Sequence, residues 1–188
     1  MLNDNQRNLI LGNADRLLAD ARLLFGHRRY ASAFALAVLG MEEIGKALLK
    51  GWEDEEPVPK PRKGMSLHVQ KQTAVSSLLL GATMARRFQY RRPALDSVDV
   101  DALTKEFKES DEGRLFGKIR DSQLDQRKQG ALYQDDDVVM AVEADYAETH
   151  VVSIFKIATD VRHLLADKVA HAAARSFYET TMTRDWEE

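Results

Sequence analysis

The length, composition and charge of this chain exclude several classes of protein. Its 188 residues suit one domain with a sizeable core, and 44% hydrophobic with 30% charged residues is ordinary for a soluble globular protein. Cysteine is absent, which excludes disulfides and thiolate metal sites, and a formal net charge of −3 argues against a protein that coats nucleic acid. Since neither a long apolar run nor a signal-peptide pattern is present, we expect a cytoplasmic protein that spans no membrane.

Apolar residues recur at helical spacing in the first part of the chain. Residues 3–25 have the pattern of an amphipathic helix, and the short turn at residues 26–29 makes the next helix its antiparallel neighbour. That second helix, residues 30–50, is apolar on nearly every side for its first dozen residues, which requires other elements to surround it. Residues 51–65 contain three of the four prolines and are predicted to be a loop. A third helix is expected from Ser66 to about residue 90.

The second half of the chain predicts a loop, a weak helix and a long helix. A loop is predicted from residue 91, with a short helix over 99–108 as an option. Residues 112–128 are then predicted to form a helix with a poor apolar stripe, and Gly130 is predicted to end this helix. Asp135 to Asp137 supply an N-cap for a helix of about 40 residues over 138–177, with a kink or break near Thr149. The sequence therefore predicts an all-α antiparallel bundle of about five helices, as one domain over 1–180 with a tail at 181–188.

The first candidate site combines the polar end of the second helix with the start of the third. Glu42, Glu43 and Lys46 lie near the end of one helix, and His68 and Lys71 share a face at the start of the next. Because one loop joins these helices, both groups lie at the same end of the bundle. A histidine beside carboxylates and lysines suits proton transfer or phosphate binding. The alternative is a set of helix-end ion pairs and a solvated histidine.

A second candidate site lies on the weak helix and just after it. Arg120 and Arg127 are seven residues apart and share a face, and Lys128, Tyr133 and Asp135 follow. Arginine holds phosphate through two parallel hydrogen bonds, and a tyrosine hydroxyl can orient a phosphate oxygen. The alternative is that this basic helix is only a solvated face.

The sequence predicts no metal ion and no cofactor. The paired Glu-x-x-His pattern of di-iron bundles is absent, and Asp160–His163 and Asp167–His171 are better explained as surface ion pairs. His150 shares helical spacing with apolar residues and is expected in the core.

Three short motifs follow one another in a characteristic order. Glu-Glu-x-Gly-Lys ends an Ala/Leu-rich helix at residues 42–46, His-x-x-Lys follows at 68–71, and Gly-x-Leu-Tyr-x-Asp occupies 130–135. With this order the chain resembles the abortive-infection family AbiV, a branch of the HEPN superfamily of helical bundles. The resemblance implies a phage-defence or toxin-like protein that forms a homodimer, and for many HEPN proteins it implies metal-independent RNA cleavage.

The resemblance also implies an active-site signature of the HEPN superfamily, Arg-x(4–6)-His. Here Arg127 is followed at the expected distance by Tyr133, so tyrosine stands where histidine is expected, whereas Arg62 with His68 fits the letters in another place. Our hypothesis is that one polar cleft cleaves RNA by attack of a 2′-hydroxyl, with His68 as acid or base and with Lys46 and Arg127 stabilising the phosphate charge. The expected catalytic residues are Glu43, Lys46, His68, Arg127 and Tyr133, and the expected substrate-binding residues are Glu42, Lys71, Arg120, Lys128 and Asp135.

A non-enzymatic function is the alternative. A helical module that binds a phage protein, an antitoxin or a nucleotide and blocks translation by contact would need only surface patches and a dimer face.

Overall fold

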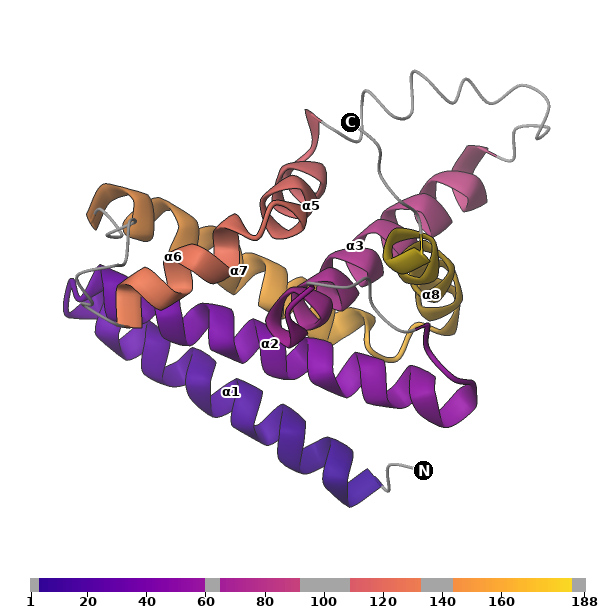
Figure 1. Ribbon diagram of the computed structural model, residues 1–188, viewed down its shortest axis with the longest axis horizontal. Helices are drawn as coiled ribbons and strands as arrows, with labels where there is room; N and C mark the ends of the chain where they lie inside the picture. Colours follow the sequence, from indigo (N-terminus) through magenta and orange to yellow (C-terminus); the bar gives the residue numbers. More distant parts are fainter. Residues whose placement is uncertain (1–3, 60–64, 92–108, 133–143, 184–188) are drawn as a thin grey trace.

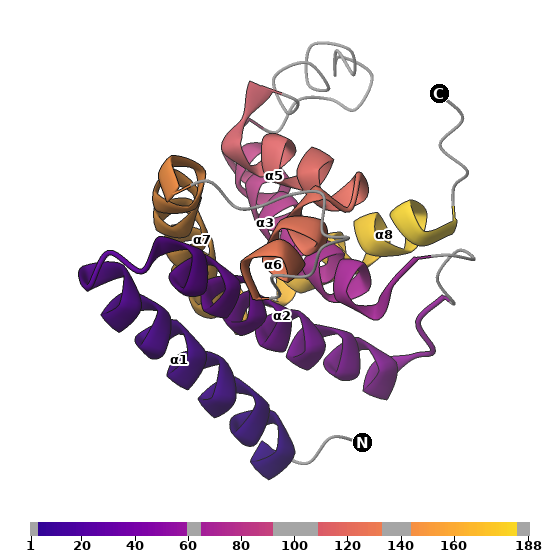
Figure 2. The same cartoon turned by 60° about the vertical axis from the view of Figure 1, so that its left-hand side comes forward.

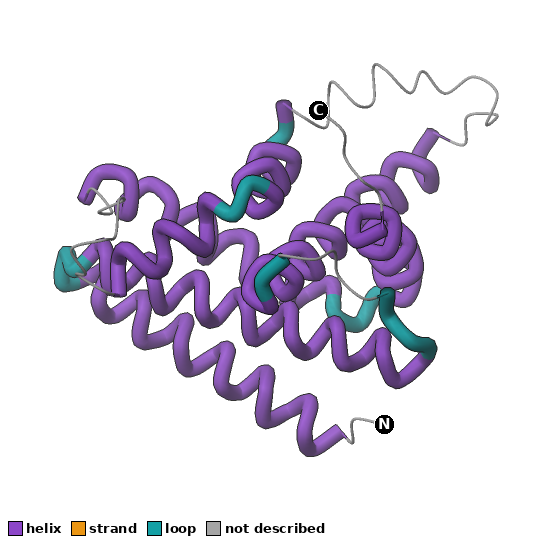
Figure 3. Tube along the Cα trace, viewed as in Figure 1, coloured by secondary structure: helices purple, strands orange, loops and turns teal. Residues whose placement is uncertain are grey.

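The computed structural model describes residues 4–59, 65–91, 109–132 and 144–183 (Figure 1). Every regular element in these ranges is an α-helix (Figure 3), which confirms the all-α class. Seven helices are described, more than the five predicted: α1 Asp4–Gly26, α2 Tyr30–Glu55, α3 Leu67–Arg91, α5 Asp111–Arg120, α6 Gln123–Leu132, α7 Ala144–Leu164 and α8 Lys168–Thr183. Within these ranges, none of the helices combines the length and apolar character that a membrane crossing needs.

Helix α2 is the centre of the fold. It packs against α1, α3, α6 and α7, and α1 lies alongside it as predicted (Figures 1 and 2). The first half of α2 is buried on nearly every side, with Ala33, Phe34, Ala35, Ala37 and Val38 fully inaccessible to solvent. The predicted all-round apolar helix is therefore buried because four other helices surround it.

Helix α2 continues to Glu55, so the prediction that residues 51–65 are all loop was wrong for the first five. Trp52, only 2% exposed, continues the core beyond residue 50 and packs its ring 5.5 Å from that of Tyr178 on α8. The helix ends where Glu56 becomes extended, at φ −162° and ψ 147°. Glu56 precedes Pro57, and a following proline disfavours helical backbone.

The predicted weak helix at 112–128 is two helices, α5 and α6. The chain turns at Asp121 and Ser122, where Ser122 adopts a φ of 57°, a conformation that interrupts a helix. Gly130 does not end the second helix, since α6 continues to Leu132.

The predicted 40-residue helix is also two helices, and its break is not near Thr149, which lies within α7. Helix α7 ends at Leu164 and α8 begins at Lys168. Oδ1 of Asp167 accepts hydrogen bonds from the backbone N–H groups of Val169 (3.0 Å) and Ala170 (3.1 Å), so Asp167, predicted to pair with His171, is the N-cap of α8. The C-terminal tail was predicted to start at residue 181, whereas α8 continues to Thr183. The predicted helix at 99–108 and the predicted N-cap at 135–137 lie outside the described residues.

Two glycines allow α3 to pack closely against its neighbours. A Cβ at Gly45 would overlap the backbone carbonyl of Lys71, so α2 and α3 cross in backbone contact there. A Cβ at Gly81 would lie 2.5 Å from the backbone nitrogen of Ala174, which makes a second close crossing between α3 and α8. The Gly45 crossing holds the first turn of α3 over the polar end of α2, where the candidate site lies.

Candidate functional site

His68 on α3 and Glu42 on α2 form the centre of the site. Nδ1 of His68 lies 2.6 Å from Oε2 of Glu42, and the Nε2 amide of Gln72 donates to Oε1 of the same carboxylate at 2.8 Å. His68 and Gln72 are one helical turn apart, so both project from one face of α3 towards α2. Ser66 begins this turn, since its hydroxyl accepts the N–H of Val69 at 3.2 Å as an N-cap.

Lys128 on α6 completes the centre from a third helix. Its ammonium lies 2.7 Å from Oε1 of Glu42 and 2.7 Å from Oδ1 of Asp125. The contact to Asp125 is an ion pair without hydrogen-bond alignment, because Oδ1 meets no donor at suitable angles. The side chains of Glu42 and Lys128 are each only 3% exposed. Two carboxylates therefore hold one buried ammonium between α2 and α6.

The contacts define the hydrogen-bonding state of the His68 ring. An ionised carboxylate only accepts hydrogen bonds, so Nδ1 of His68 carries the proton that it shares with Glu42. The Lys128 ammonium also lies 3.1 Å from Nδ1, and it donates a hydrogen bond to Oε1 of Glu42 at 2.7 Å. The His68 side chain is 44% exposed, and its contacts with Glu42 and Lys128 are both made through Nδ1. A carboxylate on one ring nitrogen and an accessible second nitrogen is an arrangement that suits proton transfer.

Three side chains in this centre have the spacing of metal ligands. One ligand atom each from Glu42, His68 and Asp125 lies within 4.8 Å of the others. The ammonium of Lys128 already contacts both carboxylates, so a metal ion would have to displace a buried cation. The chemistry available without that displacement is that of a histidine, not of a metal.

Glu43 and Lys46 form an ion pair with each other. Nζ of Lys46 pairs with Oε2 of Glu43 at 3.2 Å, one turn along α2. Lys46, 36% exposed at its side chain, lines a groove of about 500 Å³ together with Lys50 and Lys71. The structure thus joins His68 to Glu42 and Lys128 rather than to Glu43, and Lys46 and Lys71 are neighbours on an open groove beside it.

The second predicted site is divided by the structure. Arg127 lies close enough to Lys118 on α5 for its charge, after burial, to lower the pKa of that lysine, whereas the adjacent Lys128 binds Glu42. Arg127 therefore interacts with a residue of α5, whereas Lys128 pairs with a residue of α2. The side chains of Arg120, Tyr133, Asp135 and Arg62 lie outside what the structure describes, so their predicted roles remain predictions.

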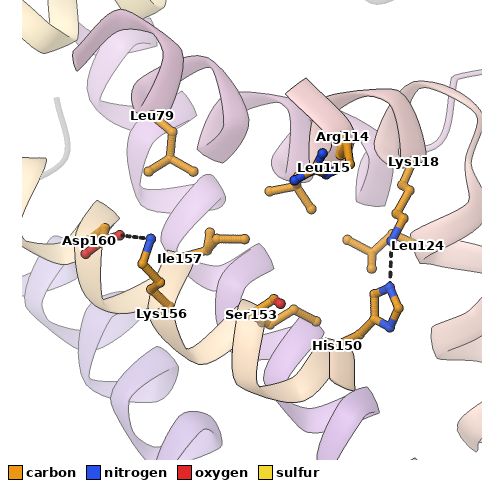
Figure 4. Close-up of a pocket in the computed structure, with 11 residues that line it drawn as sticks. Leu79, Arg114, Leu115, Lys118, Leu124, His150, Ser153, Lys156, Ile157 and Asp160 are labelled. Carbon is orange, nitrogen blue, oxygen red and sulfur yellow. Dashed lines mark hydrogen bonds and ion pairs between the residues drawn. The ribbon is translucent and has the colours of Figure 1, made fainter. Parts of the chain in front are cut away.

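His150 is half-buried rather than enclosed in the core. Its Nε2 lies 2.6 Å from Nζ of Lys118, at the edge of a pocket between α5 and α7 (Figure 4). Sequence reasoning missed Lys118 altogether, along with Gln72 and Asp125. Spacing could have suggested the last two, since Gln72 is four residues after His68 and Asp125 three before Lys128.

The fold and this site define an all-helical protein with a buried carboxylate–histidine–lysine centre. A family model of HEPN type described as AbiV matches residues 4–162, which contain every member of the centre. The chain belongs to the AbiV family of HEPN proteins. Comparisons with curated proteins and with solved structures gave no match.

Proposed function

We propose that this AbiV-family chain acts in abortive infection of bacteria by phage and that it cleaves RNA without a metal ion. The observation that carries the proposal is the 2.6 Å contact between Nδ1 of His68 and Glu42, on a ring whose side chain is 44% exposed. The carboxylate fixes the ring and its tautomer, and the accessible Nε2 can accept or return a proton.

The proposed reaction is an internal attack by RNA on its own phosphodiester. Nε2 of His68 takes the proton of a 2′-hydroxyl, whose oxygen bonds to the adjacent phosphorus while the bond to the 5′-oxygen breaks. The products are a 2′,3′-cyclic phosphate and a 5′-hydroxyl, whose oxygen takes its proton from water or from the protonated His68. Neither an oxidant nor a second substrate is required, and a positioned acid–base group contributes about 10²- to 10⁴-fold to such a step.

The groove beside the centre supplies positive charge for the substrate backbone. Lys46, Lys50 and Lys71 line it together with Glu53, and the lysine ammonium groups can meet phosphate oxygens as charge develops. Lys128 has another role, because a side chain that is 3% exposed and bound to two carboxylates orients Glu42 rather than touching RNA. The assignment of Lys128 to substrate binding is therefore replaced by a positioning role.

A non-catalytic interaction module is the second candidate. The burial of Glu42 and Lys128 favours it, because a buried ion pair that joins α2 to α6 can be retained for the fold alone. In that case the groove lysines would bind an acidic partner. Such a partner would be a phage protein, an antitoxin or a second copy of the chain, and the HEPN relationship favours a homodimer.

RNA cleavage by the purified full-length protein in EDTA separates the two candidates. We expect cleavage by the wild type with 2′,3′-cyclic phosphate ends, no cleavage of a 2′-O-methyl version of the same RNA, and at least a hundredfold lower rate for His68→Ala. The matched control is His163→Ala, which changes an exposed histidine of α7 and should keep the wild-type rate. Absence of wild-type cleavage, or equal rates for the two variants, would support the interaction module.

A further inference from the structure

The groove beside the His68 centre changes its charge along α2. Four residues that line it recur at intervals of three and four and so share one face of this helix: Lys46, Leu49, Lys50 and Glu53. Lys71 joins them from α3, one turn after His68, where the backbone of Lys71 meets α2 at Gly45. The groove is therefore basic where the two helices cross, and its carboxylate lies two turns further along α2.

Most of the charges in this groove are not paired with one another. Lys46 pairs with Glu43 at 3.2 Å, but within the described ranges neither Lys50 nor Lys71 has a carboxylate oxygen within 4.0 Å. Glu53 likewise has no cation within that distance among the described residues. The groove thus offers free ammonium donors and a free carboxylate acceptor to a ligand that can use both.

Apolar side chains form much of the remaining wall. They come from the face of α2, from the chain that follows this helix and from the start of α3: Leu49, Val58, Pro59 and Leu67. Leu67 directly precedes His68 and is 60% exposed, so its side chain is available to a ligand. Tyr178 on α8 lines the same groove, and burial and then the charge of Glu53 raise the pKa of its hydroxyl. Such a wall suits the flat, apolar faces of a ring that carries polar groups at its edge.

We propose that this groove binds a guanine nucleotide of the RNA, with a phosphate at the lysines, the ring against the apolar wall and the base edge on Glu53. The inference rests on the proposed cleavage of RNA, because it names the nucleotide that lies next to the bond that His68 breaks. The groove volume of about 500 Å³ lies in the roughly 300–1,000 Å³ range of ligand sites. Lys46 and Glu53 are about 10 Å apart along the axis of α2, a span that suits one nucleotide from its phosphate to its base edge.

The carboxylate of Glu53 selects guanine among the four bases. Guanine presents two adjacent donors, N1–H and N2–H, on its Watson–Crick edge, and a carboxylate has two oxygens that only accept. Adenine and cytosine each place an acceptor nitrogen beside their amino group, and uracil has one N–H between two carbonyl oxygens. Each of these three bases would therefore bring an acceptor against the carboxylate.

Calorimetric titration of the full-length protein with guanosine 3′,5′-bisphosphate tests the inference. This probe carries both flanking phosphates and has no internal phosphodiester bond to cleave. The wild type should bind it at least about tenfold more tightly than adenosine 3′,5′-bisphosphate, which lacks the base edge, or guanosine, which lacks the phosphates. Glu53→Ala changes an exposed side chain and should abolish the preference for guanine without weakening the binding of the adenosine probe.

The lysines should act on both probes alike. Lys71→Gln should weaken the binding of both bisphosphates by at least about fivefold, because it removes a phosphate contact and leaves the base contact in place. The matched control is Lys156→Gln, which changes an exposed lysine of α7 and should leave both affinities unchanged.

The binding and cleavage proposals fail separately. A wild type that prefers the guanosine probe but cleaves no RNA would support the guanine site and reject the cleavage. A wild type that cleaves RNA but binds the guanosine and adenosine bisphosphates equally would overturn the guanine site alone. No binding of the guanosine bisphosphate, or a preference for guanine that survives Glu53→Ala, would also overturn it.

Discussion

Nδ1 of His68 lies 2.6 Å from Oε2 of Glu42, a residue 26 positions earlier in the chain. The crossing of α2 and α3 at Gly45 brings them together, and Lys128 on α6 holds the other carboxylate oxygen at 2.7 Å. One glutamate thus links three helices and contacts His68, the half-exposed histidine of the centre. The same contact serves stability and the proposed chemistry, so the two must be measured separately.

Glu42 and Glu43 are adjacent glutamates with very different environments, which makes them a matched pair. Glu42→Gln removes a buried charge from contacts with Lys128 and His68, and a loss of about 3–5 kcal/mol in the free energy of unfolding is expected. Glu43→Gln removes only a partly exposed pair with Lys46 and should cost at most about 1 kcal/mol. Urea unfolding followed by circular dichroism measures both; equal losses would contradict the assigned environments.

A double-mutant cycle tests whether Lys128 and Glu42 act as a pair. Lys128→Met alone leaves Glu42 and Asp125 buried beside each other without their cation, so it should also cost about 3–5 kcal/mol. In the double variant with Glu42→Gln, the combined loss should be smaller than the sum of the single losses by about 1–3 kcal/mol. Additive losses would show that the two side chains do not interact.

Hydrophobic periodicity predicted the helices that are built from long apolar stripes and failed where tertiary contacts decide. Helices α1, α2 and α3 follow from their patterns, and the packing of Trp52 against α8 explains why α2 continues past residue 50. The turn at Ser122 and the N-cap at Asp167 each interrupt a stretch whose pattern allows a continuous helix. These breaks reflect how the shorter helices pack, which a single sequence does not reveal.

The sequence predicted most residues of the candidate site but not which of them contact one another. The sequence placed His68 beside the acidic end of α2 and assigned Glu43 to the catalytic group, whereas the structure pairs His68 with Glu42. Helix α2 is surrounded on nearly all sides, so its apolar pattern does not show which glutamate faces α3. The choice depends on where α6 packs, and α6 has too weak an apolar stripe for its position to be predicted. Lys118 and His150 meet across 32 residues for the same reason.

Gly45 and Gly51 test the close crossing that forms the site. Both lie in α2, but a Cβ at Gly45 would overlap the Lys71 carbonyl, whereas a Cβ at Gly51 would meet no other atom within 4 Å. Gly45→Ala should destabilise the protein by about 1–3 kcal/mol through overpacking, and Gly51→Ala should stabilise it by up to about 1 kcal/mol through helix propensity. Thermal unfolding of both variants measures the difference; a Gly45→Ala protein as stable as the wild type would contradict the crossing.

His171 makes stability depend on pH in a defined direction. Burial, and next the charge of Arg7, lower the pKa of His171 below its usual value of about 6.5, and a hydrogen bond to the Leu165 carbonyl opposes this only in part. Between the lowered pKa and about 6.5 the unfolded chain binds more protons than the folded one. The contribution of His171 to stability is therefore present above that window and is lost as pH falls through it.

Urea unfolding of a His171→Phe variant between pH 5 and 7 checks this dependence. Phenylalanine keeps a ring beside Trp52, whose ring centroid is 6.5 Å from that of His171, but removes the titrating group. The slope of stability against pH should be smaller in this variant than in the wild type, whereas His163→Asn should keep the wild-type slope because His171 is still present. An unchanged slope in His171→Phe would assign the dependence to other groups.

The most direct test of the central claim, that His68 held by Glu42 cleaves RNA, is the cleavage rate of the two glutamine variants in EDTA. Rates are compared per folded molecule, so that the lower stability of Glu42→Gln does not enter. Wild type and Glu43→Gln are expected to cleave within about threefold of each other, and Glu42→Gln at least about tenfold more slowly, because its His68 loses the carboxylate that orients it. Equal rates for Glu42→Gln and Glu43→Gln, or no cleavage by the wild type, would contradict the account.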